Sequence, residues 1–231
     1  MRGHVQKVGQ QYAAQNNDYF TALFDGGFEK QDFVETQVQF ELAVTHFVNP
    51  MRALAAKVLD VEMRSGIAQN ITDELGGGVQ EKSHSATFRS FLARLDATSL
   101  DSLEQREVWP EVAKFNAMLD AACAEDQVWR GAAVMGMIEF MFATISGLIG
   151  RGVVARGWLT ESDMVHYALH QELDEQHAED FFLLLESGWR SSPATQAVIV
   201  AGFKEGASGF FALYDGLFQA RQRRWRRNVP S

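Results

Sequence analysis

Residues 131–150 read GAAVMGMIEFMFATISGLIG, and Glu139 is the only charged residue among these twenty. The length would permit a membrane span, but a carboxylate in the middle of a bilayer is costly. No other segment of the chain is comparably apolar. A helix that is apolar on every side in a water-soluble protein is a core helix surrounded by others. The segment therefore predicts a helical fold with no membrane span, in which Glu139 is a buried acid that needs a partner.

Helical patterning continues on both sides of this segment. The spacing of apolar, capping and helix-ending residues predicts helices over residues 33–54, 60–74, 88–95, 110–123, 131–150, 164–185 and 193–221. No segment alternates as a strand would. The expected fold is all-α, a single-domain bundle of about seven helices with the usual short loops. We place this domain in residues 1–220 and treat residues 221–231 as a separate Arg-rich tail.

Composition narrows the class of protein. The chain has 231 residues, 46% of them hydrophobic, which is enough to bury a sizeable core and excludes wholesale disorder. The single cysteine, Cys123, excludes an internal disulfide and every cysteine-rich metal site. The first residues, MRGHVQKVGQQYAAQNND, contain no apolar run of the kind that a signal peptide has. We therefore expect a cytoplasmic protein.

Charge is distributed unevenly along the chain. Five arginines lie in residues 221–231, so residues 1–220 carry 16 basic and 30 acidic residues, a net charge of −14. An acidic body repels phosphate backbones, and nucleic acid is therefore not an expected partner. The basic tail has the composition of a segment that docks on an acidic protein or a membrane surface. A solvated, frayed C-terminus is the simpler interpretation.

The first candidate site lies in residues 166–182, HYALHQELDEQHAEDFF. His170, Asp174 and His177 are spaced i, i+4 and i+7, which places them on one stripe of a helix. Two imidazoles and a carboxylate on one face form half of a metal site suited to iron, manganese or zinc. A solvent-facing helix that happens to be rich in histidine and acid would look the same in sequence.

The second candidate pair is Glu74 and His84. On an unbroken helix ten residues would separate these side chains by about 15 Å. Residues 76–78 between them are three glycines, which would let the backbone turn and bring the pair together. The alternative is an ordinary glycine-rich helix end followed by a new helix. Glu139 completes the set, because a metal cation would keep a buried carboxylate ionised, although an arginine or hydroxyl partner would also satisfy it.

The order Glu74, His84, Glu139, His170, Asp174, His177 resembles the haem-oxygenase-like di-iron oxidases in spacing and helical context. The resemblance covers most of the chain and implies a seven-helix haem-oxygenase-like fold. It also implies that these six residues bind two Fe²⁺ ions that react with O₂ through a bridging peroxide, with an external electron donor. Asp174 would be the mobile ligand that closes on iron.

Members of this family that oxygenate nitrogen carry an extra carboxylate on an early helix. Glu41 matches that position best and Glu35 second, so Glu41 is expected as a ligand or a catalytic acid beside the ligands. A surface acid on an amphipathic helix is the alternative for Glu41. His166 lies one turn before His170 and is expected either as a core histidine or as a group that orients a ligand.

The resemblance implies an O₂-dependent oxidase or oxygenase, and Glu41 favours a small amine or amino acid as substrate. The expected outcomes are N-hydroxylation, desaturation or cyclisation, or C–C cleavage. Oxidative decarboxylation of a fatty acid at the same site is the alternative. Side chains near Glu139 are expected to wall the substrate pocket, and three cations are candidate carboxylate anchors. These residues are Met137, Phe140, Met141 and Phe142 for the wall and Arg52, Lys82 and Arg156 for the anchors.

Other functions stay open. They are a non-catalytic metal-binding helical protein, an interaction module that uses the tail, and a haem protein with Gly202, Gly206 and Gly209 on its distal helix. Thiaminase-like proteins of the same fold use a catalytic cysteine, but Cys123 reads as a small core residue. The sequence leaves a homodimer open as the assembly and does not identify the reductant.

Overall fold

The structure is a computed structural model that describes residues 1–97 and 107–223. These residues form nine α-helices and three short 3₁₀ turns, and they contain no strand. The α-helices are α1 Arg2–Gln11, α2 Asp18–Asp25, α3 Lys30–Ala55, α4 Val61–Glu74, α5 His84–Arg94, α6 Pro110–Ala124, α7 Val128–Ala155, α8 Val165–Ser191 and α9 Pro193–Ala220. The all-α prediction is confirmed.

The expected number of seven helices is wrong for the described residues. The seven predicted segments correspond to α3–α9, and the additional helices, α1 and α2, precede them. α1 buries only Val5 and Val8, so its apolar pattern is too sparse to read in the sequence. α2 has eight residues between the cap Asn17 and Gly26, and the short length hides its period.

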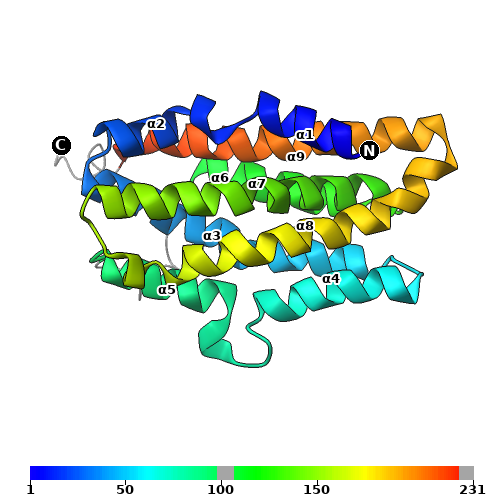
Figure 1. Cartoon of the computed structure of the whole chain (residues 1–231), viewed down its shortest axis with the longest axis horizontal. Coiled ribbons are helices and arrows are strands. Elements are labelled where there is room, and N and C mark those ends of the chain that lie inside the picture. Colours follow the sequence, from blue (N-terminus) through cyan, green and yellow to red (C-terminus); the bar gives the residue numbers. More distant parts are fainter. Residues whose placement is uncertain (98–106, 224–231) are drawn as a thin grey trace.

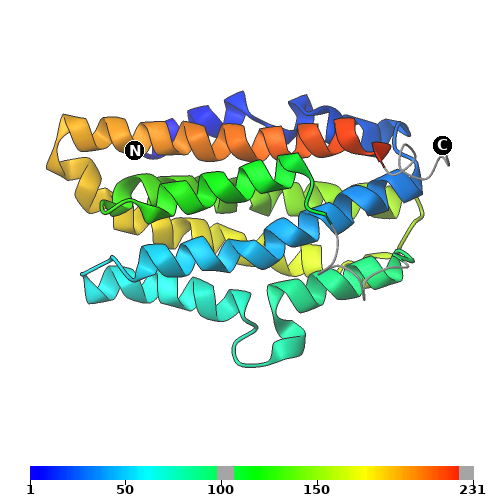
Figure 2. The same cartoon turned by 180° about the vertical axis from the view of Figure 1, so that it is seen from behind.

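α7 is the central helix of the bundle (Figure 1). It packs most extensively against α8 and α9. α1 and α2 lie along α9 on one side, whereas α4 and α5 lie on the opposite side of the molecule, where both contact α3 and α8 (Figures 1 and 2). α8 therefore packs against α7 on one side and against α4 and α5 on the other (Figure 1).

Within residues 1–97 and 107–223, two helices, α7 and α9, are long and apolar enough to cross a membrane, but α7 is a core helix. Its most apolar window is 83% buried inside the bundle, compared with 44% for α9. Glycines let α9 approach α7 closely, since a Cβ at Gly206 would lie 2.6 Å from the carbonyl oxygen of Val134. The prediction that residues 131–150 form a helix surrounded by others is confirmed.

A hydrogen-bonded chain of polar side chains is buried between α2, α3 and α8. The Tyr167 hydroxyl donates to the Gln37 side-chain oxygen, and Gln37 Nε2 donates to the Tyr19 hydroxyl over 2.6 Å. Tyr19 then bonds Thr36 Oγ1 at 2.8 Å, and Thr36 donates to the Phe33 carbonyl. We call Tyr19, Thr36, Gln37 and Tyr167 the tyrosine network. Every donor and acceptor that it links is satisfied inside the protein.

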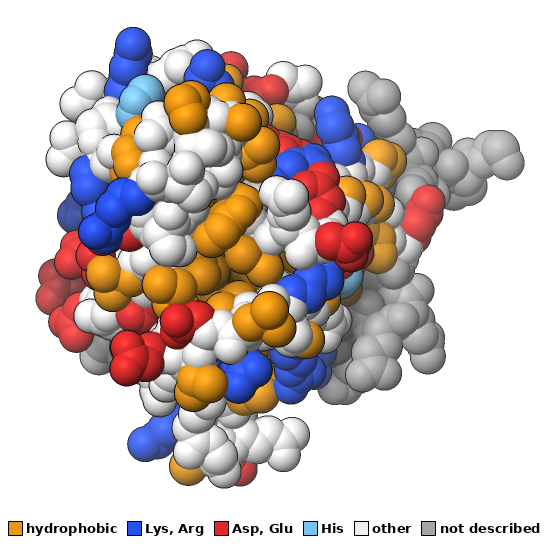
Figure 3. Space-filling view, turned by 90° about the vertical axis from the view of Figure 1, so that its right-hand side faces the viewer, with side chains coloured by type: hydrophobic (Ala, Val, Ile, Leu, Met, Phe, Trp, Pro, Cys, Tyr) orange, Lys and Arg blue, Asp and Glu red, His pale blue; other side chains and the backbone are white. Residues whose placement is uncertain are grey.

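The surface mixes charge and apolar side chains. At the end of the bundle where α8 turns into α9, Lys, Arg, Asp and Glu side chains surround exposed apolar ones (Figure 3). The first residues of the predicted tail pack on the bundle, because Arg223 forms an ion pair with Glu111 and Arg221 lies over the Phe218 ring. Residues 224–231 of that tail lie outside the described residues.

Candidate metal centre

One stripe of α8 faces the interior of the bundle. His166, His170, Asp174 and His177 are each at most 2% exposed, whereas the acids between them, such as Glu172 and Glu175, are exposed. Helical spacing of three, four and seven residues keeps the four buried side chains on one side. The alternative of a solvent-facing polar helix is therefore wrong for this stripe.

Glu74 and His84 meet across the triple-glycine turn. α4 ends at Glu74, and Gly76, Gly77 and Gly78 have φ values of 82°, 61° and 88°, a backbone region that glycine adopts without a steric penalty. A Cβ at Gly76 would lie 2.6 Å from the backbone nitrogen of Ser83. α5 begins at His84, whose Nδ1 donates a hydrogen bond to Glu74 Oε2. The predicted turn and the approach of the pair are confirmed.

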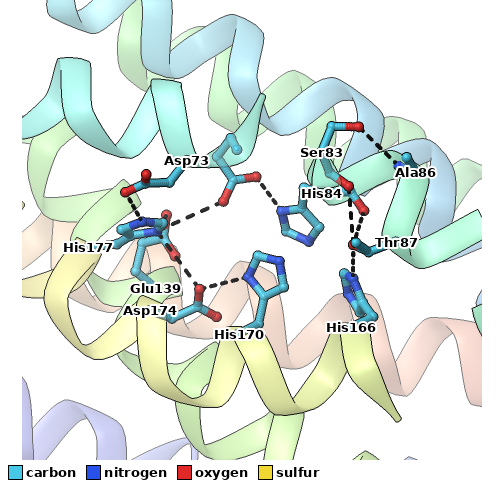
Figure 4. Close-up of polar contacts among 11 residues, drawn as sticks. Asp73, Ser83, His84, Ala86, Thr87, Glu139, His166, His170, Asp174 and His177 are labelled. Atoms are coloured by element: carbon cyan, nitrogen blue, oxygen red, sulfur yellow. Dashed lines mark hydrogen bonds and ion pairs between the residues drawn. The ribbon is translucent and has the colours of Figure 1, made fainter. Parts of the chain in front are cut away.

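Glu139 enters the same interior from α7 and is 3% exposed. His177 Nδ1 lies 3.9 Å from Glu139 Oε1, 3.9 Å from Glu74 Oε1 and 3.8 Å from Asp174 Oδ1 (Figure 4). On the other side His170 Nδ1 bonds Asp174 Oδ1 at 2.9 Å. Four helices thus bring the six predicted residues to one place, together with His166. We call these seven side chains the ligand cluster: Glu74, His84, Glu139, His166, His170, Asp174 and His177.

The ligand cluster contains two groups with the proximity that a metal ion requires. The ligand atoms of His84, His166 and His170 all lie within 4.8 Å of one another, and so do those of Glu74, Glu139 and His177. Ligands at about 2.1 Å from one metal are separated by roughly 3–4 Å, so a small contraction would close either group. Asp174 lies between the groups through its contacts with His170 and His177.

Unsatisfied polar atoms show that the cluster fits metal ions. Each of the seven side chains buries at least one nitrogen or oxygen that has no hydrogen-bond partner: Glu74 Oε1, His84 Nε2, Glu139 Oε1, His166 Nε2, His170 Nε2, Asp174 Oδ2 and both nitrogens of His177. An unsatisfied buried polar group costs about 1–3 kcal/mol, and native structures contain few of them. Imidazole and carboxylate atoms are also the donor types that iron accepts.

The acids of the cluster differ in protonation. Burial and the nearby Glu74 raise the pKa of Glu139 well above its usual range, and burial with Glu139 and Glu74 does the same to the pKa of Asp174. Burial also acts to raise the pKa of Glu74, but His84, His170 and His177 outweigh it and bring that pKa to about 2. Without a cation, therefore, the ionised form is favoured at Glu74 and the protonated form at Glu139 and Asp174.

The neutral form is favoured at His166 and His170. Burial lowers the pKa of both well below the usual value, and the neighbouring imidazoles lower it further. A neutral imidazole is the form that binds a metal. The electrostatics of the site therefore favour metal binding at neutral pH on the nitrogen side.

Two residues that support the cluster were missed in the sequence. Thr87 Oγ1 bonds His166 Nδ1 at 2.9 Å, and Asp73 Oδ2 lies 3.5 Å from His177 Nε2. Such partners fix the ring orientation of metal-binding histidines. Asp73 precedes Glu74 and Thr87 lies one turn after His84, so proximity to a predicted ligand was the only signal in the sequence.

A small apolar cavity adjoins the cluster. It measures about 30 Å³ and is bordered by Glu139 and His84. Its other walls are Phe40, Ala43, Val44, Phe47, Phe115, Ile138, Phe142 and Phe210. Of the predicted pocket residues Phe142 lines this cavity, whereas Phe140 and Met141 line a groove on the α1 side of α7. No lysine or arginine borders the cavity among the described residues.

Glu41 is buried but lies outside both groups. Its carboxylate accepts hydrogen bonds from Arg89 Nε at 2.7 Å and Thr45 Oγ1 at 3.0 Å. The candidate carboxylate anchors also lie elsewhere. Arg52 and Lys82 are exposed, and Arg156 donates to the carbonyl oxygens of Leu23 and Phe28. The structure therefore brings together the six ligand candidates and His166, but not Glu41 or the three cations.

The alternative sites have ordinary packing roles. Cys123 is 1% exposed, and burial raises its pKa to about 12, which makes it a poor nucleophile. Cβ atoms at Gly202 and Gly206 of α9 would collide with Ala133 and Val134 of α7. These glycines therefore allow close packing of two helices, the role they have in place of a distal haem pocket.

Comparison with known proteins identifies a family and several structures that the chain resembles. Residues 34–209 match a family described as iron-containing redox enzymes, and no curated protein sequence matches the chain. A TenA homologue from Pseudomonas syringae pv. tomato str. DC3000 superposes with a TM-score of 0.74 at 17% identity, covering 93% of this chain and 91% of that one. A CADD-like protein of unknown function from Nostoc punctiforme PCC 73102 gives 0.73 at 16% identity, covering 94% and 96%.

A third solved structure makes the fold explicit. A domain of unknown function with a haem oxygenase-like fold, from Shewanella denitrificans OS217, gives a TM-score of 0.76 at 15% identity, covering 98% of this chain and 94% of that one. At such identities the three structures show the fold alone. The predicted haem-oxygenase-like fold is confirmed.

Proposed function

The chain belongs to the family of iron-containing redox enzymes, and from this premise we propose that it is a non-haem di-iron oxidase or oxygenase. It would use O₂ to oxidise a small organic substrate. The observation that carries the proposal is the convergence of unsatisfied, fully buried imidazole and carboxylate atoms from four helices. A cluster of this kind destabilises the protein unless a ligand satisfies it.

Six side chains would hold the metals: Glu74, His84, Glu139, His170, Asp174 and His177. Two Fe²⁺ ions bound there would supply electrons to O₂, and an external reductant would restore them. His84 and His170 are already oriented, because their Nδ1 atoms are bonded to Glu74 and Asp174. Their Nε2 atoms are left free for a metal.

Proton movement accompanies metal binding in this proposal. Glu139 and Asp174 hold protons in the metal-free protein because burial raises the pKa of each. Both side chains would release these protons on binding a cation, and their carboxylates would then be ionised. Asp174 is suited to be the mobile ligand, because Oδ1 bonds His170 while Oδ2 has no partner.

The adjoining cavity limits the substrate. Aromatic and aliphatic side chains exclude water from the face of Glu139 and His84, which protects an oxidising site from side reactions. A volume of about 30 Å³ suits a small group, and we propose a small amine or amino acid whose hydrocarbon part enters the cavity. The expected reactions are N-hydroxylation, desaturation or cyclisation, and C–C cleavage.

Oxidative decarboxylation of a fatty acid is the second candidate, and one observation favours it. The cavity walls are apolar and include no cation among the described residues, as the alkyl chain of a fatty acid would require. A long chain would also need the cavity to extend, so the two candidates differ in the length of substrate that the protein accepts.

The test is anaerobic loading of the metal-free protein with Fe²⁺, a count of iron per chain, and rapid mixing with O₂. We expect two irons and a transient visible band, with His170→Ala losing both and His46→Ala, whose ring pairs with Asp120 outside the cluster, losing neither. Amines, amino acids and fatty acids of increasing length are then compared for their effect on O₂ consumption. Absence of bound iron would contradict the di-iron site, whereas iron that binds but does not react with O₂ would contradict the oxidase and leave a non-catalytic metal-binding protein.

A further inference from the structure

A fourth histidine lies in the ligand cluster beyond the six residues that resemble the known family. His166 is 1% exposed, and its ring centroid lies 4.9 Å from that of His84 and 4.7 Å from that of His170. One of its ring nitrogens lies within 4.8 Å of a ring nitrogen of His84 and of His170. Proximity alone does not distinguish a ligand from a core histidine, so the orientation of the ring decides.

The three histidines share one pattern of partners. His84 Nδ1 bonds Glu74, His166 Nδ1 bonds Thr87 Oγ1, and His170 Nδ1 bonds Asp174. In each ring the other nitrogen, Nε2, is buried and has no partner. Histidines that bind metals almost always have one nitrogen fixed by a hydrogen bond while the other faces the metal, and Thr87 is such a partner outside the ligand set. A core histidine without a ligand role would have no reason to leave Nε2 unsatisfied.

We propose that His166 is a metal ligand, and that the cluster consists of two unlike metal positions. The nitrogen-rich position has His84, His166 and His170, and the carboxylate-rich position has Glu74, Glu139 and His177. Glu74 links them, because Oε2 bonds His84 whereas Oε1 lies 3.9 Å from His177. The inference rests on the metal binding of the proposed function and adds a ligand and an asymmetry to it.

The difference in ligands between the two positions predicts the order in which they bind metal ions. Imidazole nitrogen suits Zn²⁺, Cu²⁺ and Fe²⁺, whereas carboxylate oxygen suits Mn²⁺ and Mg²⁺. The nitrogen-rich position therefore takes the first Zn²⁺ or Cu²⁺ ion and takes it more tightly. Thr87 acts as a positioning residue in this arrangement, since its hydroxyl bonds His166 Nδ1 and leaves Nε2 free to bind a metal.

The test uses Zn²⁺ and Cu²⁺ as probes, so that it does not depend on enzyme activity. His166→Gln keeps an amide that can bond Thr87 but supplies no imidazole. We expect this variant to bind the first Zn²⁺ at least tenfold more weakly in chelator competition, with the second Zn²⁺ unchanged. His177→Ala should show the opposite pattern, with the first Zn²⁺ bound as in the wild type and the second bound more weakly. His46→Gln, outside the cluster, should match the wild type in both.

A direct count of nitrogens keeps the proposal testable if a variant fails to fold. Wild-type protein with one equivalent of Cu²⁺ should show electron paramagnetic resonance splitting from three imidazoles, and His177→Ala should retain all three. Two nitrogens in the wild type, or unchanged Zn²⁺ affinity in a folded His166→Gln, would overturn the inference. O₂ consumption by the iron-loaded protein is measured separately, so the oxidase can fail while His166 remains a ligand, or stand while His166 is shown to be structural.

Discussion

The bundle buries two polar regions that meet on α8 at the adjacent residues His166 and Tyr167, and they are completed in different ways. In the tyrosine network Tyr167, Gln37 and Tyr19 pass hydrogen bonds from one to the next and end on a backbone carbonyl. In the ligand cluster, which begins one residue earlier at His166, every side chain keeps at least one buried atom without a partner. The two regions are buried to a similar degree, but the polar atoms have hydrogen-bond partners in the tyrosine network, whereas several lack them in the ligand cluster.

Whether buried polar atoms have hydrogen-bond partners therefore distinguishes structural from functional residues better than burial alone does. A satisfied polar network contributes to stability and to the uniqueness of the core, whereas an unsatisfied one destabilises the protein until something binds. We therefore expect substitutions in the tyrosine network to affect folding, and substitutions in the ligand cluster to affect metal binding.

The largest effect should come from Glu139→Leu. We expect loss of at least one metal per chain and at least a hundredfold lower O₂ consumption. The metal-free variant should be no less stable than the wild type, because an apolar side chain replaces a buried acid. Metal analysis and thermal unfolding with a chelator present would check both. A metal-free variant that is much less stable would mean that Glu139 has a structural role, and the contrast between the two regions would fail.

Gln37→Leu tests the other region. It removes the acceptor of the Tyr167 hydroxyl and the amide that donates to the Tyr19 hydroxyl, which keeps its bond to Thr36, and we expect the free energy of unfolding to fall by about 2–3 kcal/mol. Zn²⁺ affinity, measured by calorimetry, should stay within about threefold of the wild type. A strong loss of affinity would show that the network also holds the ligands in place.

The pH dependence of stability should distinguish the metal-free from the metal-loaded protein. Above about pH 6.5 the histidines of the unfolded chain are neutral, and the neutral form of His166 and His170 is also favoured in the fold. The carboxyl groups therefore determine how stability changes with pH in this range. The folded pKa values of Glu139 and Asp174 are raised, so the folded protein holds protons that the unfolded chain has lost. The metal-free protein therefore loses about 1.4 kcal/mol per pH unit for each such proton as the pH rises toward the folded pKa.

Metal should abolish this loss, because the cation replaces the protons. Chemical unfolding at several pH values, with chelator and with saturating Zn²⁺, measures the two slopes. Equal slopes would contradict the assignment of the protons to the cluster.

The smallest effect should come from Glu41→Gln. The amide can still bond Thr45, and Arg89 is 44% exposed at its side chain, so we expect a stability loss of about 1 kcal/mol or less. The iron count should be unchanged, because both contacts of Glu41 lie outside the two metal groups. A lower iron count in this variant would restore Glu41 to the role that the sequence suggested.

Particular residues show how far sequence reasoning reaches. His170, Asp174 and His177 could be placed on one face because helical geometry fixes the direction of side chains four and seven residues apart. The triple glycine could be read as a turn because only glycine adopts those φ values cheaply. His166 could not be assigned, because its role depends on His84 and Thr87 of α5, which are 82 and 79 residues away in the chain. Asp73 was missed for the same reason.

The sequence by itself determined the all-α fold, the buried position of Glu139 and the six spaced ligand candidates, because local periodicity and spacing are written in consecutive residues. Tertiary structure alone decided that Glu41 pairs with Arg89, that the adjoining cavity is small and apolar, and that His166, with an unsatisfied buried nitrogen, lies beside two other histidines. These properties depend on which helices pack together and on which hydrogen bonds remain unmade, and neither is a property of any one segment.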